Sequence, residues 1–430
     1  MNLLYDSKEV IEQCQIQLLK KTLNYVYKYS CFYKKIFDTN HIKISEINTL
    51  SDIEKLPITT KHELLTYNND FYCGEIKEAS DIVTTSGSTG IKPIIHPLTQ
   101  RDLSRLMLNE TLSFEIAGID NNDAVMLCTA LDGSFVAGLA YYYGLKNTAG
   151  AVFRVGAKSL HAQAEILSRY NISTIVGVPS NLIKLFKYMA SNHLYGADKV
   201  RKMVLIGESI RNKNLSLNQL GSRLASCYPN AELHSTYANT ETCTSFCECN
   251  IGNGGHLLPN LAYIEIVDEV GNRVEEGHVG RLLITTFDAQ GMPLLRYDTG
   301  DLTYLINEPC KCGIKAQRIG PILDRNKSIS KIGGVTFSQS QLENVILSIP
   351  QIDDYCIVID KDDNETAQAK VFYLTLLENS KHVGRILKQK IWDCVRISVE
   401  VECCTQAQLH EKQHITNSRK PVRYINNNGI

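Results

Sequence analysis

The sequence contains no apolar run long enough to serve as a secretory signal or a membrane-spanning helix. Its first residues, MNLLYDSKEVIEQCQIQLLKK, include acidic residues and lysines before any apolar stretch of useful length. A membrane span needs about 20 consecutive apolar residues, and a signal peptide needs an uninterrupted apolar core. We therefore predict a cytoplasmic protein with no membrane partner.

An excess of basic residues is also missing. The 45 lysines and arginines are balanced by 46 aspartates and glutamates, so the formal net charge is -1. Proteins that bind nucleic acid carry a positive patch that faces the phosphates. The charge balance therefore gives no support to a nucleic-acid partner. Internal repeats and low-complexity segments are absent as well.

Cysteine is plentiful, but the arrangement of a disulfide-stapled protein is lacking. The 14 cysteines are spread over 430 residues, whereas small secreted frameworks concentrate them in a short chain. In a reducing compartment most are expected to be buried thiols that pack like small apolar residues. Two groups need separate treatment: Cys243 to Cys249, and Cys310 with Cys312.

Alternating helix-length and strand-length apolar runs place the middle of the chain in the α/β class. Between Tyr141 and Met203 they read GAVFRV, HAQAEILSRY, STIVGV, PSNLIKLFKYM and KMVLIG. Strand, helix, strand, helix and strand in this order are typical of parallel βαβ units. The later runs AYIEIVD, GHVGRLLITTF and DLTYLI are shorter and separated by Gly and Pro. They predict a smaller antiparallel sheet.

The two ends of the chain add helices and a second domain. Apolar positions at helical spacing predict a helix from Ser7 to Phe37. After about Asn326 the chain has its own helices and strands, enough for a small α+β domain. We therefore predict an N-terminal domain over residues 1–326 and a C-terminal domain over residues 327–430.

A hydroxyl-rich segment, DIVTTSGSTGIKPIIHP, spans Asp81 to Pro97. Glycines let backbone N–H groups approach anionic oxygens, and several hydroxyls can share the charge of a triphosphate. No Gly-Lys-Ser/Thr closes the segment, which excludes a Walker loop. Taken alone, a solvated turn is the simpler interpretation. The residues expected to face phosphates are Thr85, Ser86, Gly87, Ser88, Thr89 and Gly90.

Five further motifs follow in a fixed order: LIGES, STYANTE, PLLRYDTGDL, ILDRNKSISKIGGVTFSQSQLE and SRKPVR. Each is weak alone, but the ordered set resembles the adenylate-forming enzymes, in particular their phenylacetate-CoA ligase branch. The resemblance extends to CFYKKIF and DIEKLPITTKHELL near the N-terminus, so it covers nearly the whole chain.

The resemblance implies a two-step reaction. A carboxylate attacks the α-phosphate of ATP to give an acyl-adenylate and pyrophosphate, and a thiol then displaces AMP to give a thioester. Such chemistry needs charge neutralisation and alignment more than a covalent nucleophile. The implied partners are ATP, Mg²⁺, a small carboxylic acid and coenzyme A.

The resemblance also assigns nucleotide-binding roles to particular residues. Thr85 to Gly90 would hold the β- and γ-phosphates, Thr240 would contact the α-phosphate, and Glu241 would hold Mg²⁺, which prefers oxygen ligands. The adenine would be lined by Gly207, Glu208 and Tyr237, and the ribose hydroxyls would be bound by Asp301 with Arg325 nearby. In isolation, Glu241 would read as a surface glutamate and Asp301 as a turn residue.

Two lysines take special roles in the resemblance. Lys420 matches the near-terminal lysine that stabilises charge developing during adenylation, although alone it would read as a solvated charge. Lys327 matches the hinge about which a mobile C-terminal lid rotates between the two half-reactions. The resemblance thus implies the fold of the adenylate-forming superfamily, a large α/β body with a small α+β lid.

Three departures from the family pattern stand out. The hydroxyl-rich segment continues as GIKP, with two residues between glycine and proline where the family usually has one. Lys92 therefore precedes the proline. Asp298 stands where a basic residue is common, and Arg419 replaces a glycine before the lysine. None removes a residue needed for charge neutralisation, so we predict an active enzyme; a relative that only binds nucleotide is the alternative.

Four residues near the small sheet could form a structural zinc site: Cys249, His256, Cys310 and Cys312. The resemblance to the phenylacetate-CoA ligase branch implies such a site, because some members of that branch carry one. Three thiolates with one imidazole form a closed tetrahedral set of zinc ligands. The C-x-C spacing is tighter than usual, and Cys247 could substitute for Cys249. Unmetallated thiols are the alternative.

The acyl pocket is expected in ALDGSFVAGL and near the nucleotide loops. Its candidate residues are Leu131, Asp132, Phe135, Ala137, Gly138 and Ala238, and a phenyl ring among small neighbours would suit a flat aromatic acid. Asp132 could pair with a polar substituent, but a helix N-cap is the simpler role. The acceptor is coenzyme A by default or the phosphopantetheine arm of an acyl carrier protein, and a homodimer is a further expectation.

Overall fold

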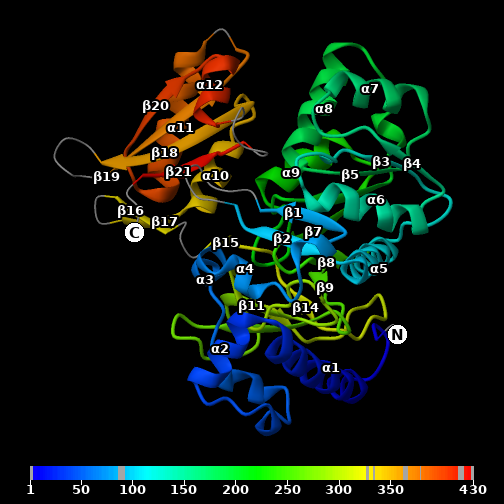
Figure 1. Cartoon of the computed structure of the whole chain (residues 1–430). Helices are drawn as coiled ribbons and strands as arrows, with labels where there is room; N and C mark the ends of the chain where they lie inside the picture. Colours follow the sequence, from blue (N-terminus) through cyan, green and yellow to red (C-terminus); the bar gives the residue numbers. More distant parts are fainter. Residues whose placement is uncertain are drawn as a thin grey trace. The chain divides into compact units, whose positions relative to one another are not determined.

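The computed structural model describes residues 3–85, 93–325, 329–332, 335–361, 367–377, 379–414 and 421–427. It separates into two compact units: among the described residues, the larger comprises 3–85 and 93–323, and the smaller begins at residue 324. Among the helices in these ranges, none combines the length and apolar character that crossing a bilayer requires. Figure 1 labels the elements along the chain.

The large unit begins with helices, and one of them ends earlier than expected. The helix predicted over 7–37 is interrupted at Ser30, which has an extended backbone and accepts the Tyr33 N–H at its hydroxyl. Ser30 therefore caps a new helix, as serine commonly does. The elements of this region are α1 (Lys8–Tyr29), α2 (Cys31–Thr39), α3 (Lys61–Thr66) and α4 (Asn68–Phe71), with the short 3-10 turns η1 (Ile44–Glu46), η2 (Ser51–Lys55) and η3 (Ile76–Glu78).

A nine-stranded mixed sheet forms the centre of the large unit. Its strand order is β13-β14-β9-β8-β7-β6-β5-β3-β4. The segment from β4 to β7 is parallel and includes the βαβ pattern predicted between Tyr141 and Met203. The bounds are β3 (Ala124–Leu127), β4 (Ala151–Arg154), β5 (Thr174–Gly177), β6 (Lys202–Ile206), β7 (Glu232–Asn239), β8 (Thr244–Glu248), β9 (Gly255–His256), β13 (Leu305–Ile306) and β14 (Arg318–Ile319).

Helices cover this sheet, and glycine permits the closest approach. A Cβ on Gly138 of α6 would lie 1.9 Å from the Ala130 carbonyl oxygen, and one on Gly144 would lie 2.6 Å from the Cβ of Glu110 on α5. Only glycine fits at both positions. The helices are α5 (Gln100–Ile116), α6 (Val136–Thr148), α7 (Leu160–Arg169), α8 (Pro179–Ser191), η4 (Ala197–Lys199) and α9 (Gln219–Cys227).

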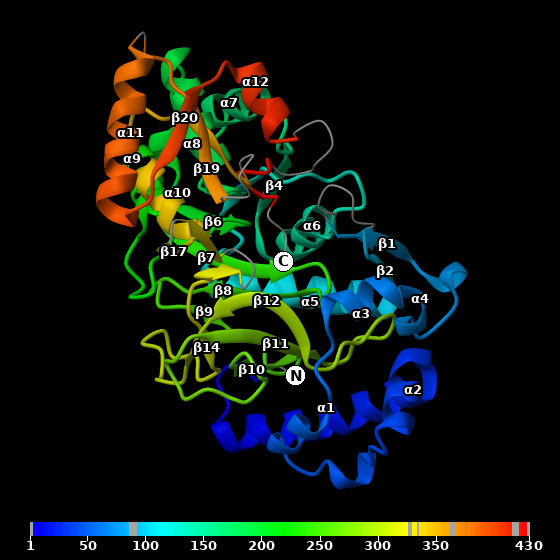
Figure 2. The same ribbon diagram turned by 90° about the vertical axis from the view of Figure 1, so that its left-hand side faces the viewer.

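The predicted smaller antiparallel sheet is present. Strands β10 (Ala262–Val267), β11 (Gly280–Thr286) and β12 (Tyr297–Thr303) pair in sequence order. Helix α1 runs beside them, because Gln15 donates to the carbonyls of Pro259 and Ala262 (Figure 2). The two ends of the hydroxyl-rich segment pair as a separate hairpin, β1 (Asp81–Thr84) with β2 (Ile95–Leu98).

The small unit is an α+β sandwich with its own core. Its sheet has the order β20-β19-β18-β21, and apolar residues of this sheet pack against α10 and α11. The elements are β15 (Asp324–Arg325), β16 (Ile329–Ile332), β17 (Val335–Ser338), α10 (Gln339–Leu347), β18 (Asp354–Lys361), β19 (Ala367–Leu374), α11 (Ser380–Val395), β20 (Val399–Cys403), α12 (Gln406–Lys412) and β21 (Tyr424–Asn426).

Candidate active site

Tyr237 and Asp301 join the two sheets of the large unit. Tyr237 lies on β7 and donates a hydrogen bond to Asp301 Oδ2 on β12 at 2.8 Å, while Asn239 donates to the Tyr237 hydroxyl at 3.2 Å. Burial and the neighbouring Asp301 carboxylate raise the pKa of Tyr237 well above its ordinary value. The phenol therefore stays protonated and remains a donor to Asp301.

Glu241 lies two residues after the end of β7. Its side chain is 9% exposed and pairs with Lys61 Nζ of α3 at 3.4 Å. Burial and the Glu241 charge raise the pKa of Tyr297, so this second phenol also stays neutral beside the carboxylate. A carboxylate held between an ammonium and a phenol is an oxygen donor of the kind Mg²⁺ prefers.

His96 lies in the same neighbourhood, on β2 opposite Val83 of β1. Burial lowers its pKa to about 4, against the opposing effect of the Asp102 and Glu241 charges. The imidazole is therefore neutral at physiological pH. The sequence assigned no role to His96, Lys61 or Tyr297. Each lies on a segment that is far from Glu241 along the chain and comes close to it only in the folded structure.

Thr85 closes the base of the hydroxyl-rich segment. Its N–H donates to the Ile94 carbonyl at 3.0 Å, and its hydroxyl accepts the Ile94 N–H at 3.0 Å. The residues Ser86, Gly87, Ser88, Thr89 and Gly90 lie outside the described residues. Thr85 and Ile94, which precede and follow these residues in the described chain, therefore form a doubly hydrogen-bonded pair, and His96 lies two residues beyond Ile94.

Two of the predicted adenine residues, Gly207 and Glu208, follow β6. Gly207 has a φ of 77°, a left-handed conformation that favours glycine. The Glu208 carboxylate accepts the backbone N–H of Ser180 at 2.9 Å and its hydroxyl at 2.8 Å. Glu208 therefore caps the first turn of α8, where a negative charge is favourable.

The expected acyl-pocket residues surround the start of α6. Leu131 and Asp132 are exposed, Gly138 is buried, and Thr84 of the hairpin donates to the Ser134 carbonyl at 3.0 Å. This bond ties the ALDGSFVAGL segment to the hairpin that carries Thr85. On the neighbouring strand β7, Ala238 is exposed and pairs with Ser245.

The helix N-cap role expected for Asp132 is wrong. The N-cap of α6 is Phe135, which makes no side-chain capping bond. Asp132 instead pairs with Lys158 Nζ at 2.9 Å, and both side chains are largely exposed. Because Ser134 has a φ of 55° and turns the chain before the helix, Asp132 lies three residues too early to cap it.

The four residues proposed for zinc do converge. The ligand atoms of Cys249, His256, Cys310 and Cys312 all lie within 4.8 Å of one another. The Sγ atoms of Cys249 and Cys310 are 3.7 Å apart, and Cys312 Sγ lies 3.5 Å from His256 Nε2. Cys247 is outside this group and accepts a hydrogen bond from the Thr236 hydroxyl at 3.1 Å.

Besides Ser86 to Gly90, three further predicted site residues have side chains that the structure does not describe. Lys327 and Lys420 lie outside the described residues, and Arg325 is described only as backbone, in β15. Thr240 is half-buried between Asn239 and Glu241, and its carbonyl accepts the Cys243 thiol at 3.2 Å.

Comparisons with known proteins identify the family. The model of the AMP-binding enzymes matches residues 51–287. The chain is 28% identical to phenylacetate-coenzyme A ligase of Thermus thermophilus over 85% of this chain and 82% of the relative. It is 24% identical to the same enzyme of Pseudomonas putida over 96% and 95%. A solved structure of 2-hydroxyisobutyryl-CoA ligase has a TM-score of 0.83 at 16% identity, covering 98% of this chain and 91% of that chain.

The chain therefore belongs to the AMP-binding enzyme family and has the fold of the adenylate-forming superfamily. Within it, the chain falls in the phenylacetate-CoA ligase-like branch and is an AMP-forming acid–CoA ligase. The resemblance inferred from the ordered motifs is thus confirmed.

Proposed function

We propose that the chain activates an aromatic carboxylic acid as its acyl-adenylate and transfers the acyl group to coenzyme A. The observation that carries this proposal is that β7 and the residues after it contact β12 twice, through Tyr237 with Asp301 and through Glu241 with Tyr297. His96, on the hairpin of the hydroxyl-rich segment, lies close enough to Glu241 to feel its charge. A ribose acceptor and a metal-binding carboxylate are thereby available to one nucleotide.

The nucleotide is held by this chain's own groups. One oxygen of the Asp301 carboxylate accepts hydrogen bonds from the ribose hydroxyls, while the other accepts the Tyr237 hydroxyl. Gly207 and the Tyr237 ring line the adenine, and Thr240 donates to the α-phosphate. Thr85 to Gly90 hold the terminal phosphates with backbone and hydroxyl donors. Arg325 supports the ribose.

Charge neutralisation drives the first half-reaction. Glu241 would hold Mg²⁺, which when bound would supply positive charge to the phosphate oxygens. Lys61, whose Nζ lies 3.4 Å from the Glu241 carboxylate, adds an ammonium group in the same region. Lys420 stabilises charge developing between the attacking carboxylate and the α-phosphate, and Lys327 is the hinge for the second half-reaction. We propose that the C-terminal domain begins at residue 327.

An aromatic acid suits the segment at the start of α6. Phe135 would contribute an aromatic ring, Leu131 an apolar side chain, and Gly138 and the exposed Ala238 of β7 would leave space beside them. The two relatives named above act on phenylacetate by name. Asp132 and Lys158 lie at the exposed end of this segment, where a polar substituent of the acid would meet them.

The Cys/His cluster fits a structural zinc ion. In tetrahedral sites zinc lies about 2.3 Å from sulfur and about 2.1 Å from nitrogen, so that two ligand atoms are about 3.6–3.8 Å apart. The Cys249–Cys310 sulfur pair at 3.7 Å and the Cys312–His256 pair at 3.5 Å are close to this separation. Burial and Arg318 lower the pKa of His256 to about 4, which leaves a neutral imidazole as ligand. Cys249, His256, Cys310 and Cys312 would hold the metal, which would join β8, β9 and the β13–β14 loop.

A pyrophosphate-release screen over aromatic and aliphatic acids tests the function. We expect acid-dependent pyrophosphate release with at least one aromatic acid, and near-complete loss in Lys420→Ala, with a smaller effect on transfer from preformed acyl-adenylate. Release of ADP would indicate a kinase, and ATP binding without turnover would indicate a binding-only relative. Equal adenylation by Lys420→Ala and the parent would overturn the role of Lys420.

The acceptor is tested separately. Purified enzyme, acid and ATP are offered either coenzyme A or an acyl carrier protein with its phosphopantetheine arm. We expect formation of acyl-CoA. Exclusive loading of the carrier protein would replace coenzyme A with the alternative acceptor.

A further inference from the structure

A bulge on β12 carries Asp301. Arg281 of β11 pairs with Leu302, and Leu283 pairs with Asp298, with a shift of register between them. One residue of β11, Leu282, therefore faces three residues of β12. Bulges of this kind bend a strand and turn a side chain away from its regular direction. Here the side chain at the end of the bulge is the proposed ribose acceptor.

Side chains within the bulge fix its backbone. Asp298 Oδ1 accepts the Gly300 N–H at 2.9 Å, and Thr299 Oγ1 accepts the Asp301 N–H at 3.2 Å while donating to the Leu282 carbonyl at 2.9 Å. Gly300 has a φ of 72°, which only glycine adopts without strain. The position of Asp301 is therefore set by the Asp298 and Thr299 side chains.

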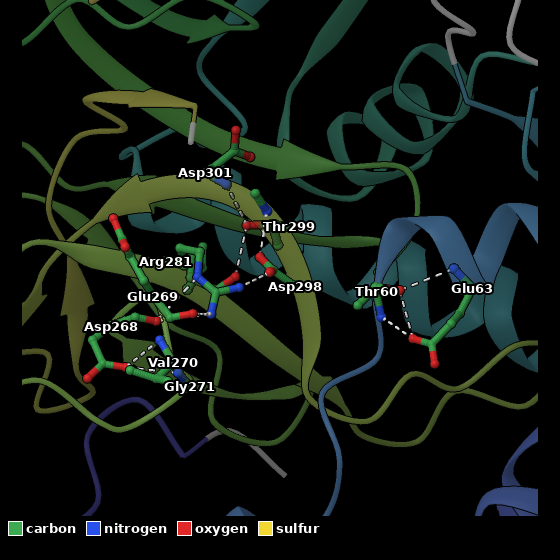
Figure 3. A network of polar contacts seen from close by, with 12 residues as sticks. Thr60, Glu63, Asp268, Glu269, Val270, Gly271, Arg281, Asp298, Thr299 and Asp301 are labelled. Atoms are coloured by element: carbon green, nitrogen blue, oxygen red, sulfur yellow. Dashed lines mark hydrogen bonds and ion pairs between the residues drawn. The ribbon is translucent and has the colours of Figure 1, made fainter. Parts of the chain in front are cut away.

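Arg281 fixes Asp298 in turn (Figure 3). Its guanidinium forms an ion pair with Asp298 Oδ2, so that both carboxylate oxygens of Asp298 are engaged. The same guanidinium donates to the carbonyls of Asp268 at 3.0 Å and Glu269 at 3.3 Å. The Arg281 and Asp298 side chains are only 14% and 15% exposed. Planar guanidinium groups hold carboxylates in a defined orientation.

We propose that Arg281 and Asp298 are positioning residues that set the Asp301 carboxylate for the nucleotide ribose. This inference rests on the proposed ribose-binding role of Asp301. Neither residue needs to touch the nucleotide. Arg281 orients Asp298, Asp298 caps the bulge through Gly300, and the bulge orients Asp301 toward Tyr237 and the ribose.

Ribose recognition gives a readout that a merely stabilising ion pair would not move. The quantity measured is the ratio of kcat/KM for ATP to kcat/KM for 2′,3′-dideoxyATP, with pyrophosphate release as the signal. Because both values come from one preparation, the ratio is independent of the fraction of active enzyme. Hydrogen bonds to a charged acceptor predict a parent ratio of at least roughly tenfold.

Four variants separate the contributions. Asp301→Ala removes the carboxylate proposed to accept the ribose hydroxyls, and Asp298→Ala removes the side chain that accepts the Gly300 N–H. Arg281→Met removes the guanidinium that pairs with Asp298. Asp298→Asn keeps an oxygen for the Gly300 N–H but weakens the ion pair with Arg281. We expect the ratio to fall to about one in Asp301→Ala. In Asp298→Ala and Arg281→Met it should decrease several-fold, and in Asp298→Asn it should decrease less. The last variant also covers the case in which Asp298→Ala fails to fold.

A remote ion pair of the same unit supplies the matched control. Lys202 pairs with Asp123 at 2.9 Å, with side chains 23% and 7% exposed. Lys202→Met should lower the melting temperature and leave the ratio unchanged. An equal fall in this variant would mean general destabilisation and would overturn the proposal.

Two results distinguish this inference from the function on which it rests. A parent-like ratio in Asp298→Ala, Asp298→Asn and Arg281→Met, with loss in Asp301→Ala, overturns the positioning role and leaves the ribose role of Asp301 intact. A parent-like ratio in Asp301→Ala removes the ribose role itself, and the positioning proposal falls with it.

Discussion

The Tyr237 hydroxyl lies 2.8 Å from Asp301 Oδ2 and links the central sheet to the smaller sheet. Replacement by phenylalanine would leave one oxygen of a buried carboxylate without this donor, which costs about 1–3 kcal/mol. We expect Tyr237→Phe to raise the KM for ATP roughly tenfold with little change in the KM for the acid. Steady-state kinetics with each substrate varied in turn measures both. A change confined to the acid would contradict the nucleotide assignment.

Glu241 should determine the magnesium dependence of adenylation. Glu241→Gln keeps the size of the side chain and its place beside Lys61 and Tyr297, but it removes the charge that a hard cation needs. We expect the Mg²⁺ concentration for half-maximal rate to rise and the rate at saturation to fall by about two orders of magnitude. Titration of pyrophosphate release with Mg²⁺ tests this. A parent-like Mg²⁺ curve would exclude Glu241 as ligand.

Glu110 should make the large unit less stable above neutral pH. Burial raises its pKa to about 7, although Asn109 donates to one of its oxygens. The folded state therefore binds the proton more tightly than the unfolded state. The protonated Glu110 therefore contributes to the free energy of unfolding. This contribution is fully present below about pH 4.3 and is lost as the pH rises through 7, which lowers the free energy of unfolding by up to roughly 3 kcal/mol.

Thermal melts from pH 5 to 8.5 test this carboxyl. Glu110→Gln stays neutral, so its advantage over the parent should grow with pH and reach several degrees. Glu115→Gln, an exposed site on the same helix, is the control. The same pH dependence in parent and Glu110→Gln would show that another group is responsible.

The Cys/His cluster should bind one zinc ion per chain. Cys312→Ser removes a ligand, and we expect loss of the metal and a lower melting temperature, since structural zinc contributes directly to folding. Metal analysis of purified protein and melts with and without chelator provide the measurements. Cys247→Ser, a buried cysteine outside the cluster, should keep the metal. A metal-free parent with unchanged melting in chelator would favour unmetallated thiols.

Local patterns predicted much of the fold. The runs between Tyr141 and Met203 gave strands and helices in the right order because a parallel strand and its covering helix are each defined by nearby residues. The convergence of Cys249 with Cys310 also agreed with expectation. In contrast, the helix break at Ser30 depends on one capping hydroxyl within an otherwise helical pattern.

The site was less predictable wherever the partner of a residue lies on a distant segment. Asp298 stood out in the sequence as a departure, but its partner Arg281 comes from the neighbouring strand. Lys61 belongs to a motif that carried the family resemblance, yet its contact with Glu241 joins segments 180 residues apart. A single sequence contains no signal for such pairings, because neither spacing nor periodicity connects them.

Isotope transfer from the acid to the nucleotide tests the central claim most directly. If the acid's carboxylate attacks the α-phosphate of ATP, one oxygen of an ¹⁸O-labelled carboxylate must end in AMP after the thioester forms. We predict AMP carrying one labelled oxygen and unlabelled pyrophosphate, measured by mass spectrometry. Unlabelled AMP, or label found in inorganic phosphate together with ADP, would contradict activation through an acyl-adenylate.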